Sequence, residues 1–140
     1  MKVFVDTNVL VDYICKREQF FVAAKAVFAF CFLGKIEILI SSLSIVNTLY
    51  IGRKHDSKKM KTSLSGLGKI VSFVDLPASM VLDTLNSEWA DYEDALQNAT
   101  ALCNGVDCIV TRNKKDFEKS SLPIYTPEEL LEVLIKKTDF

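Results

Sequence analysis

The sequence lacks the long apolar segments of membrane proteins. Its longest apolar run covers residues 26–33, well short of the roughly 20 residues that a helix needs to cross a bilayer. The chain also begins directly with a strand-like run at residues 3–5, which leaves no room for a signal peptide. From these absences we expect a cytoplasmic protein with no membrane partner.

The sequence also lacks the spacings of several common functional classes. Its four cysteines show no C-x-x-C pattern, which favours free, buried thiols over a zinc site. A P-loop and a G-x-G-x-x-G fingerprint are both absent. Phosphoaspartate enzymes of the haloacid dehalogenase type need a second Asp two residues after the first, and that position is Asn8 here. The four cysteines are Cys15, Cys31, Cys103 and Cys108.

A strong net charge is absent too. The formal net charge is −1, with 49% hydrophobic and 25% charged residues, a balance typical of a globular domain rather than a polycation. Basic residues nevertheless cluster twice along the chain. They are Arg53, Lys54, His55, Lys58, Lys59 and Lys61 in one group, and Arg112, Lys114 and Lys115 in the other. Either group can hold phosphates, and a solvated helix face explains it equally well.

Short apolar strands alternate with helical segments along the whole chain. Strands are expected at residues 3–5, 36–40, 71–76 and 108–110, with a short fifth strand at 124–125. Helices are expected at residues 9–15 and 20–33, from the serines at 41–44 to about 53, and at 58–70, 77–85, 92–102 and 127–136. This alternation predicts a single α/β domain over residues 1–140, a three-layer sandwich with a mainly parallel central sheet of four or five strands.

Asp6 follows the first expected strand, at the end where parallel sheets bind ligands. Thr7 and Asn8 come next and offer N-cap chemistry for a helix that begins near residue 9. At this point Asp6 has two interpretations, as a residue of the ligand cleft or only as a helix cap. Thr111–Asn113 takes the equivalent place after the fourth strand, with Asp116 one turn later.

Further polar side chains are expected at the same edge of the sheet. On the helix from residue 92, Asp91, Asp94 and Asn98 lie along one edge of the expected apolar stripe, although a capping box explains the two acids equally well. That stripe is Ala95, Ala99, Leu102 and Cys103. The oxygen donors gathered at this edge are Asp6, Asn47, Asp94, Asn113 and Asp116. Carboxylate and amide oxygens without His or Cys suit a hard cation such as Mg²⁺ or Mn²⁺.

Four motifs together resemble the PIN-domain family. They are D-T-N at residues 6–8, S-x-x-x-x-N at 42–47, E-D-A-L-Q at 93–97 and V-T-R-N-x-x-D-F at 110–117. The V-T-R-N-x-x-D-F motif is the most specific of the four, and D-T-N alone is weak evidence for the resemblance. The resemblance covers essentially the whole chain, including T-P-E-E-L at 126–130, and is strongest for the bacterial branch with Asn at the second acidic position.

The resemblance implies a metal-dependent ribonuclease, often the toxin of a toxin–antitoxin pair. Carried over residue by residue, the metal and catalytic positions are Asp6, Asn47, Asp94 and Asn113, with Asp116 close behind. Because Asn47 and Asn113 stand where the family has acids, one Mg²⁺ or Mn²⁺ ion is expected rather than two. The alternative is a catalytically weakened PIN fold that binds RNA or protein without turnover.

Other residues are expected to support this site or to bind partners. The supporting residues are Thr7, Asn8, Asp91 and Thr111, with Glu93 as a reserve acid. The expected RNA contacts are Arg112, Lys114, Lys115, Arg53, Lys54, Lys58 and Lys59. The early helices, residues 9–33, carry Phe20, Phe21, Phe28 and Phe30, more apolar surface than one small core needs. We therefore expect a homodimer or an antitoxin segment to cover part of that surface.

Overall fold

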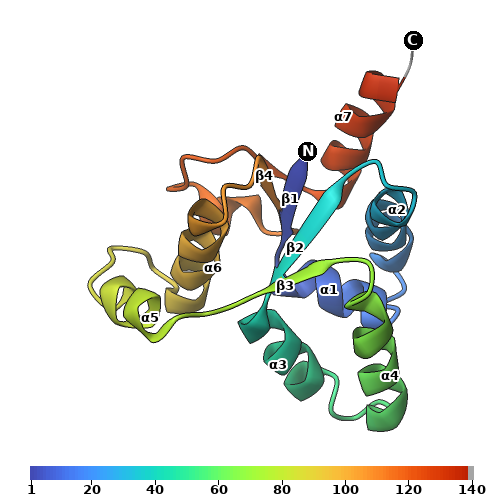
Figure 1. The fold of residues 1–140 in the computed structure, drawn as a ribbon, viewed down its shortest axis with the longest axis horizontal. Coiled ribbons are helices and arrows are strands. Elements are labelled where there is room, and N and C mark those ends of the chain that lie inside the picture. Colours follow the sequence, from blue (N-terminus) through green and yellow to red (C-terminus); the bar gives the residue numbers. More distant parts are fainter. Residues whose placement is uncertain (139–140) are drawn as a thin grey trace.

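A five-stranded sheet runs through the middle of the protein in the computed structural model, which describes residues 1–138 (Figure 1). The strands are β1 (Lys2–Val5), β2 (Glu37–Ser41), β3 (Ser72–Val74), β4 (Cys108–Val110) and β5 (Ile124–Tyr125). They lie in the order β3-β2-β1-β4-β5, and every neighbouring pair is parallel. The predicted α/β class with a parallel central sheet is confirmed.

Within the described residues, seven α-helices surround this sheet. They are α1 (Thr7–Ile14), α2 (Phe21–Phe32), α3 (Ser42–Ile51), α4 (Ser57–Leu67), α5 (Ala78–Thr84), α6 (Tyr92–Cys103) and α7 (Pro127–Thr138). Figure 1 shows α1, α2, α4 and α7 on one side of the sheet, and α5 and α6 on the other. The result is the predicted three-layer arrangement.

Alternating side chains of the strands fill two separate cores. Val3 and Val5 of β1 belong to the larger core, together with apolar side chains of α1, α2, α4 and α7. Phe4, between them in sequence, belongs to the smaller core with Ala101 of α6 and Phe117. Because both faces of β1 are buried, its sequence is a continuous apolar run without polar alternation.

The predicted starts of four helices, α1, α2, α4 and α5, are wrong by one or two residues. α1 begins at Thr7 because the Asp6 carboxylate accepts a hydrogen bond from the Thr7 backbone N–H and caps the helix. α4 begins at Ser57 because Asp56, one residue earlier, accepts from the Lys59 N–H, and the helix ends at Leu67. A 3₁₀-helix, η1 (Lys114–Phe117), is a further element that the sequence pattern did not indicate.

The buried face of α6 differs from the predicted apolar stripe. Leu102 is 47% exposed, Cys103 is exposed and Ala99 is only partly buried. The inward side chains are instead Ala95, Leu96, Gln97, Asn98, Thr100 and Ala101. Half of these are polar, so packing against the sheet, and not hydrophobicity alone, decides which side of this helix faces inward.

The cysteine prediction holds only in part. All four cysteines are free thiols, and Cys31 and Cys108 are buried as expected. Cys103, however, is exposed and Cys15 is partly buried. Cys103 is exposed because the buried face of α6 differs from the predicted one.

The exposed apolar surface lies on other residues than those predicted. Phe28 is buried, and the three other phenylalanines named in the sequence analysis are partly buried, so these rings contribute to the core. The exposed apolar side chains of α2 are instead Val22 (76%) and Phe32 (72%). Of the helices in residues 1–138, none combines the length and apolar content of a membrane span.

Candidate active site

The carboxyl ends of β1 and β4 lie side by side where the strand order changes direction. From β1 the chain continues to β2 and β3 on one side, and β4 and β5 are added on the other. In parallel sheets this is where ligands bind, because the segments that follow the two strands go to opposite faces. Asp6 directly follows β1 and Thr111 directly follows β4, so both residues belong to this edge.

Asp6 is both a helix cap and the centre of a buried hydrogen-bond network. Its side chain is almost fully buried; Oδ1 accepts from the Thr7 N–H at 2.8 Å and from Gln97 Nε2 at 3.3 Å, and Oδ2 accepts from Thr111 Oγ1 at 2.8 Å. Burial raises the pKa of Asp6, these three donors lower it, and the charge of Asp116 raises it again. Asp6 is therefore a helix cap, and its role as a residue of the ligand cleft stays a prediction.

Gln97 is a site residue that sequence reasoning missed. Its side chain is fully buried, and Nε2 donates to Ser44 Oγ at 2.8 Å and to Thr7 Oγ1 at 3.2 Å as well as to Asp6. Its Oε1 has no hydrogen-bond partner among the described residues. One signal was available: Gln97 follows Asp94 by three residues, which places both on the same side of α6.

Acidic side chains of α6 and η1 gather beside Asp6. Asp91 caps α6 by accepting from the Asp94 N–H at 3.1 Å. Asp91, Asp94 and Asp116 line one cavity of about 410 Å³, which we call the acid cleft. Burial raises the pKa of Asp94 to about 7, with further contributions from Asp6, Asp91, Asp116 and Glu93. The acid cleft thus concentrates negative charge that repels itself at neutral pH.

Asn47 lies close to this group but has a different partner from those predicted. Its Nδ2 donates to Glu93 Oε1 at 2.8 Å, linking α3 to the first turn of α6. The sequence predicts Asn47 among the oxygen donors of the metal site. Burial raises the pKa of Glu93 while the bond from Asn47 lowers it. Asn47 therefore orients a neighbouring acid.

The segment after β4 is held to the segment after β1 by side-chain hydrogen bonds. Asn8 Nδ2 donates to Thr111 Oγ1 at 3.3 Å, and Asn8 Oδ1 accepts from the Arg112 N–H at 3.3 Å. The Asn113 N–H donates to Thr111 Oγ1 at 3.2 Å, and the Asn113 residue itself is exposed. Thr7 and Thr111 use their hydroxyls in these networks, so both act on the geometry of Asp6.

The predicted RNA contacts occupy several different environments. Lys115 lines the acid cleft together with Lys119, whereas Lys114 pairs with Glu129 at 3.1 Å. In the first basic group, the Arg53 guanidinium lies 4.4 Å from the centre of the Tyr50 ring. Three lysines of that group, Lys54, Lys58 and Lys59, are exposed on or before α4. Both interpretations of that group, phosphate contact and solvated face, remain open.

The chemistry of the acid cleft fits a divalent cation. Its donors are carboxylate oxygens, and within residues 1–138 no Lys, Arg or His forms a salt bridge with Asp6, Asp91, Asp94 or Asp116. Burial, together with the charges of the neighbouring acids, raises the pKa of Asp94 to about 7. The described residues contain no group of three or more His, Cys, Asp or Glu already arranged to hold a metal ion. The acid cleft thus fits a divalent cation in its charge and in the type of its donor atoms.

Comparisons with known proteins agree with this architecture. "Ribonuclease VapC1" of Aquifex aeolicus (strain VF5) is 27% identical over 136 residues, covering 94% of each chain. A structure titled "Toxin-antitoxin complex from Klebsiella pneumoniae" has a TM-score of 0.65 at 22% identity, over 89% of this chain and 97% of that one. PAE2754 from Pyrobaculum aerophilum has a TM-score of 0.66 at 19% identity, over 97% and 90% of the two chains. These two structures support the fold.

A family model described as "PIN domain" matches residues 2–115. The match includes β1 with Asp6, the helix that carries Asn47, the acids of α6 and the segment that follows β4. It therefore covers every element that contributes to the network around Asp6. The chain belongs to the PIN domain family.

Proposed function

We propose that the protein is a divalent-metal-dependent endoribonuclease that hydrolyses RNA phosphodiester bonds and acts as the toxin of a toxin–antitoxin pair. The observation that carries this proposal is the uncompensated group of acids around Asp6 and Asp94 at the point where the strand order reverses. The resemblance to a ribonuclease of Aquifex aeolicus over 94% of the chain supports RNA as the substrate.

We assign the cation to Asp6 and Asp94, with Asn113 and Asp116 as further ligands. A divalent cation, when bound, supplies positive charge that neutralises the negative charge growing on the phosphate oxygens and activates a water molecule. The protein needs no nucleophile of its own for this chemistry. A carboxylate of the acid cleft, Asp94 or Asp116, orients the attacking water and takes up its proton. One ion is expected, since Asn47 and Asn113 provide no charge.

The RNA backbone is expected to approach the acid cleft along its basic side. Lys115 and Lys119 line the same cleft as the acids and are candidates to pair with phosphates flanking the cut. Lys119 donates to the Glu88 backbone oxygen at 2.7 Å, so Lys115 is the freer of the two. The exposed lysines on and before α4 are a second candidate contact for phosphates farther along the strand.

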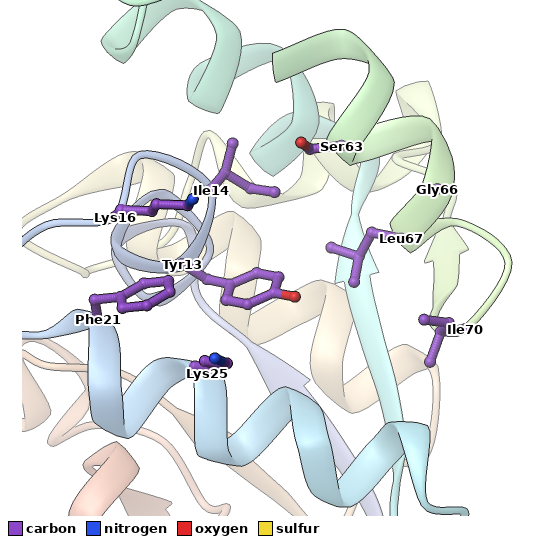
Figure 2. Close-up of a pocket in the computed structure, with 9 residues that line it drawn as sticks. All are labelled: Tyr13, Ile14, Lys16, Phe21, Lys25, Ser63, Gly66, Leu67 and Ile70. Carbon is purple, nitrogen blue, oxygen red and sulfur yellow. The ribbon is translucent and has the colours of Figure 1, made fainter. Parts of the chain in front are cut away.

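An antitoxin is the expected protein partner. Structures with titles naming VapBC or toxin–antitoxin complexes share this fold and support such a partner. A cavity of about 430 Å³ between α1, α2 and α4 offers a docking place away from the acids. Figure 2 shows Tyr13 extending toward Leu67 across this cavity, with Lys16 and Lys25 beside it. An apolar segment with acidic residues suits this lining. A homodimer and a cytoplasmic location remain predictions.

Incubation of the purified protein with RNA tests the proposed activity. We expect cleavage products with Mg²⁺ or Mn²⁺, and none when a chelator removes the ion, because the acids alone cannot neutralise the developing phosphate charge. Products should be resolved on denaturing gels, and binding should be measured separately by mobility shift. A mobility shift without products at any divalent-ion concentration would instead support the alternative, a PIN fold that only binds RNA.

A further inference from the structure

A buried ion pair lies behind the candidate active site. Asp12 of α1 is 1% exposed, and its Oδ2 accepts a hydrogen bond from Arg112 Nε at 2.6 Å. The two residues are separated by 100 positions in the sequence. The ion pair therefore joins the first helix to the segment that follows β4. Removing one member of a buried pair is costly, because the other charge is left without compensation.

The guanidinium of Arg112 is held from a second direction by an aromatic ring. Its Cζ lies 4.0 Å from the centre of the Phe20 ring, a distance typical of a cation–π contact. A second arginine, Arg17, reaches Asp12 Oδ1 only at 3.7 Å, and its side chain is 42% exposed. Arg112 is therefore the principal partner of Asp12, while Arg17 adds a weaker contact from the surface.

Arg112 stands between two residues of the candidate site. Thr111, immediately before it, donates to Asp6 Oδ2 at 2.8 Å, and Asn113, immediately after it, is an expected metal ligand. The backbone N–H of Arg112 donates to Asn8 Oδ1 at 3.3 Å. Side chain and backbone of Arg112 are thus fixed to α1 at two points. The contacts of Arg112 therefore act on the segment that carries Thr111 and Asn113.

We propose that Arg112 is a positioning residue: anchored by Asp12 and Phe20, it holds residues 111–113 in place against Asp6 and does not bind RNA. The structural part of this inference stands by itself, and its kinetic consequence rests on the proposed ribonuclease activity. The sequence had suggested a contact between Arg112 and the RNA backbone. Its Nε is bonded to Asp12, one face is covered by Phe20 and its side chain is only 23% exposed, so these contacts fix the guanidinium beside α1.

The two roles predict different kinetic changes. A phosphate contact contributes to substrate affinity, so its loss raises KM and lowers the salt dependence of binding by about one log-log unit. A positioning role acts on the geometry of the reacting groups, so its loss lowers kcat at nearly constant KM. A variant of Asp12 separates the two roles of Arg112, because the buried Asp12 side chain makes no contact with RNA.

The experiment compares Asp12→Asn, Arg112→Gln and the double variant with the wild-type protein. We expect each single variant to lower kcat by about tenfold or more with KM and salt dependence unchanged, and the double variant to lose little beyond the worse single one. Arg17→Gln is the matched control, since it removes the other arginine beside Asp12 without touching residues 111–113. It should stay within about twofold of wild type.

Amide hydrogen exchange provides a readout that needs no activity. The N–H groups of Arg112 and Asn113 donate only to side-chain oxygens, those of Asn8 and Thr111, so their protection reports directly on this segment. We expect exchange at both amides to accelerate about tenfold in Asp12→Asn and Arg112→Gln, and to be unchanged in Arg17→Gln. If the wild-type protein cleaves no RNA, the proposed function fails, and the exchange data still decide the anchoring role.

Two results would overturn the inference. One is normal exchange and normal kcat in Asp12→Asn together with a raised KM and a lower salt slope in Arg112→Gln, which identifies Arg112 as an RNA contact. The other comes from Arg112→Lys, which decides the question if Asp12→Asn does not fold. Lysine keeps the charge for a phosphate but loses the Nε donor and the planar stack, so wild-type kcat and exchange in this variant would contradict positioning.

Discussion

We expect Asp6→Asn to lower the rate of RNA cleavage by about 1,000-fold while the protein stays folded. The loss corresponds to roughly 4 kcal/mol of transition-state stabilisation, within the several kcal/mol that a metal ion supplies. Asp6 is the most buried acid of the candidate site, and three donors fix its two oxygens. An Asn keeps one acceptor oxygen for the Thr7 N–H and for Gln97, whereas the Thr111 hydroxyl, which already accepts from Asn8 and Asn113, loses its carboxylate acceptor.

The fold should tolerate this change because burial already raises the pKa of Asp6. Replacing a carboxylate that is costly to ionise with a neutral amide should leave the melting temperature of the metal-free protein unchanged or slightly higher. Asp56→Asn is the matched control, since Asp56 also caps a helix with its side chain but lies on the surface at α4. Full activity of Asp6→Asn at limiting Mg²⁺ would contradict the assigned role of Asp6.

The second large effect is expected at Asp94, where activity and stability should change in opposite directions. Asp94→Asn should lower cleavage by about 100-fold or more, because it removes a charge assigned to the cation. The same change should raise the melting temperature of the metal-free protein at pH 8 by about 3 °C, which for a chain of this length corresponds to roughly 1 kcal/mol. The cause is that an amide removes the cost of partly burying a charge and, secondly, the repulsion among the acids of the cleft.

The pH dependence of the free energy of unfolding tests whether the pKa of Asp94 is raised in the folded protein. In the folded protein the pKa of Asp94 is raised to about 7, whereas 3.8 is its ordinary value. Between these values the folded state binds more protons than the unfolded state, so the free energy of unfolding falls as pH rises through this window. Asp94→Asn should flatten that fall without abolishing it, because Asp6 and Glu93 are shifted in the same direction.

Thermal unfolding of both proteins from pH 4 to pH 8, with a chelator present throughout, measures this difference. Parallel curves for wild type and Asp94→Asn would show that neither burial nor the acids of the cleft raise the pKa of Asp94. In a separate measurement, Mn²⁺ added to the metal-free wild-type protein should stabilise it more at pH 8 than at pH 5, because the ion competes with the proton for the Asp94 carboxylate.

Local sequence patterns were sufficient for the number of strands and for the position of Asp6, although the third strand, predicted at residues 71–76, covers only Ser72–Val74. The run Val3–Val5 is apolar on both faces because β1 lies at the centre of the sheet, and an acid directly after such a strand must stand at its carboxyl end. β4 and β5 have their predicted bounds for similar reasons. The start of α4 was harder to predict, because Asp56, the residue that caps it, and Ser57 beside it both have side chains that can accept hydrogen bonds.

The parts of the site that sequence reasoning missed depend on tertiary contacts. Gln97 is buried because α6 turns its polar side toward Asp6, and helical periodicity does not indicate which side of a helix carrying small residues all round will face a sheet. The pair Asp12–Arg112 joins residues 100 positions apart, and no local signal connects them. Asn47 was expected near the metal position and lies instead against Glu93.

The most direct test of the central claim is a calorimetric titration of the metal-free protein with Mn²⁺ at pH 7, in two buffers with different ionisation enthalpies. If the acid cleft holds a divalent cation, wild-type protein should bind a single ion and release protons, since Asp94 is partly protonated at this pH. Asp6→Asn should bind at least about tenfold more weakly. Absence of binding to the wild type, or equal binding to Asp6→Asn, would contradict the claim.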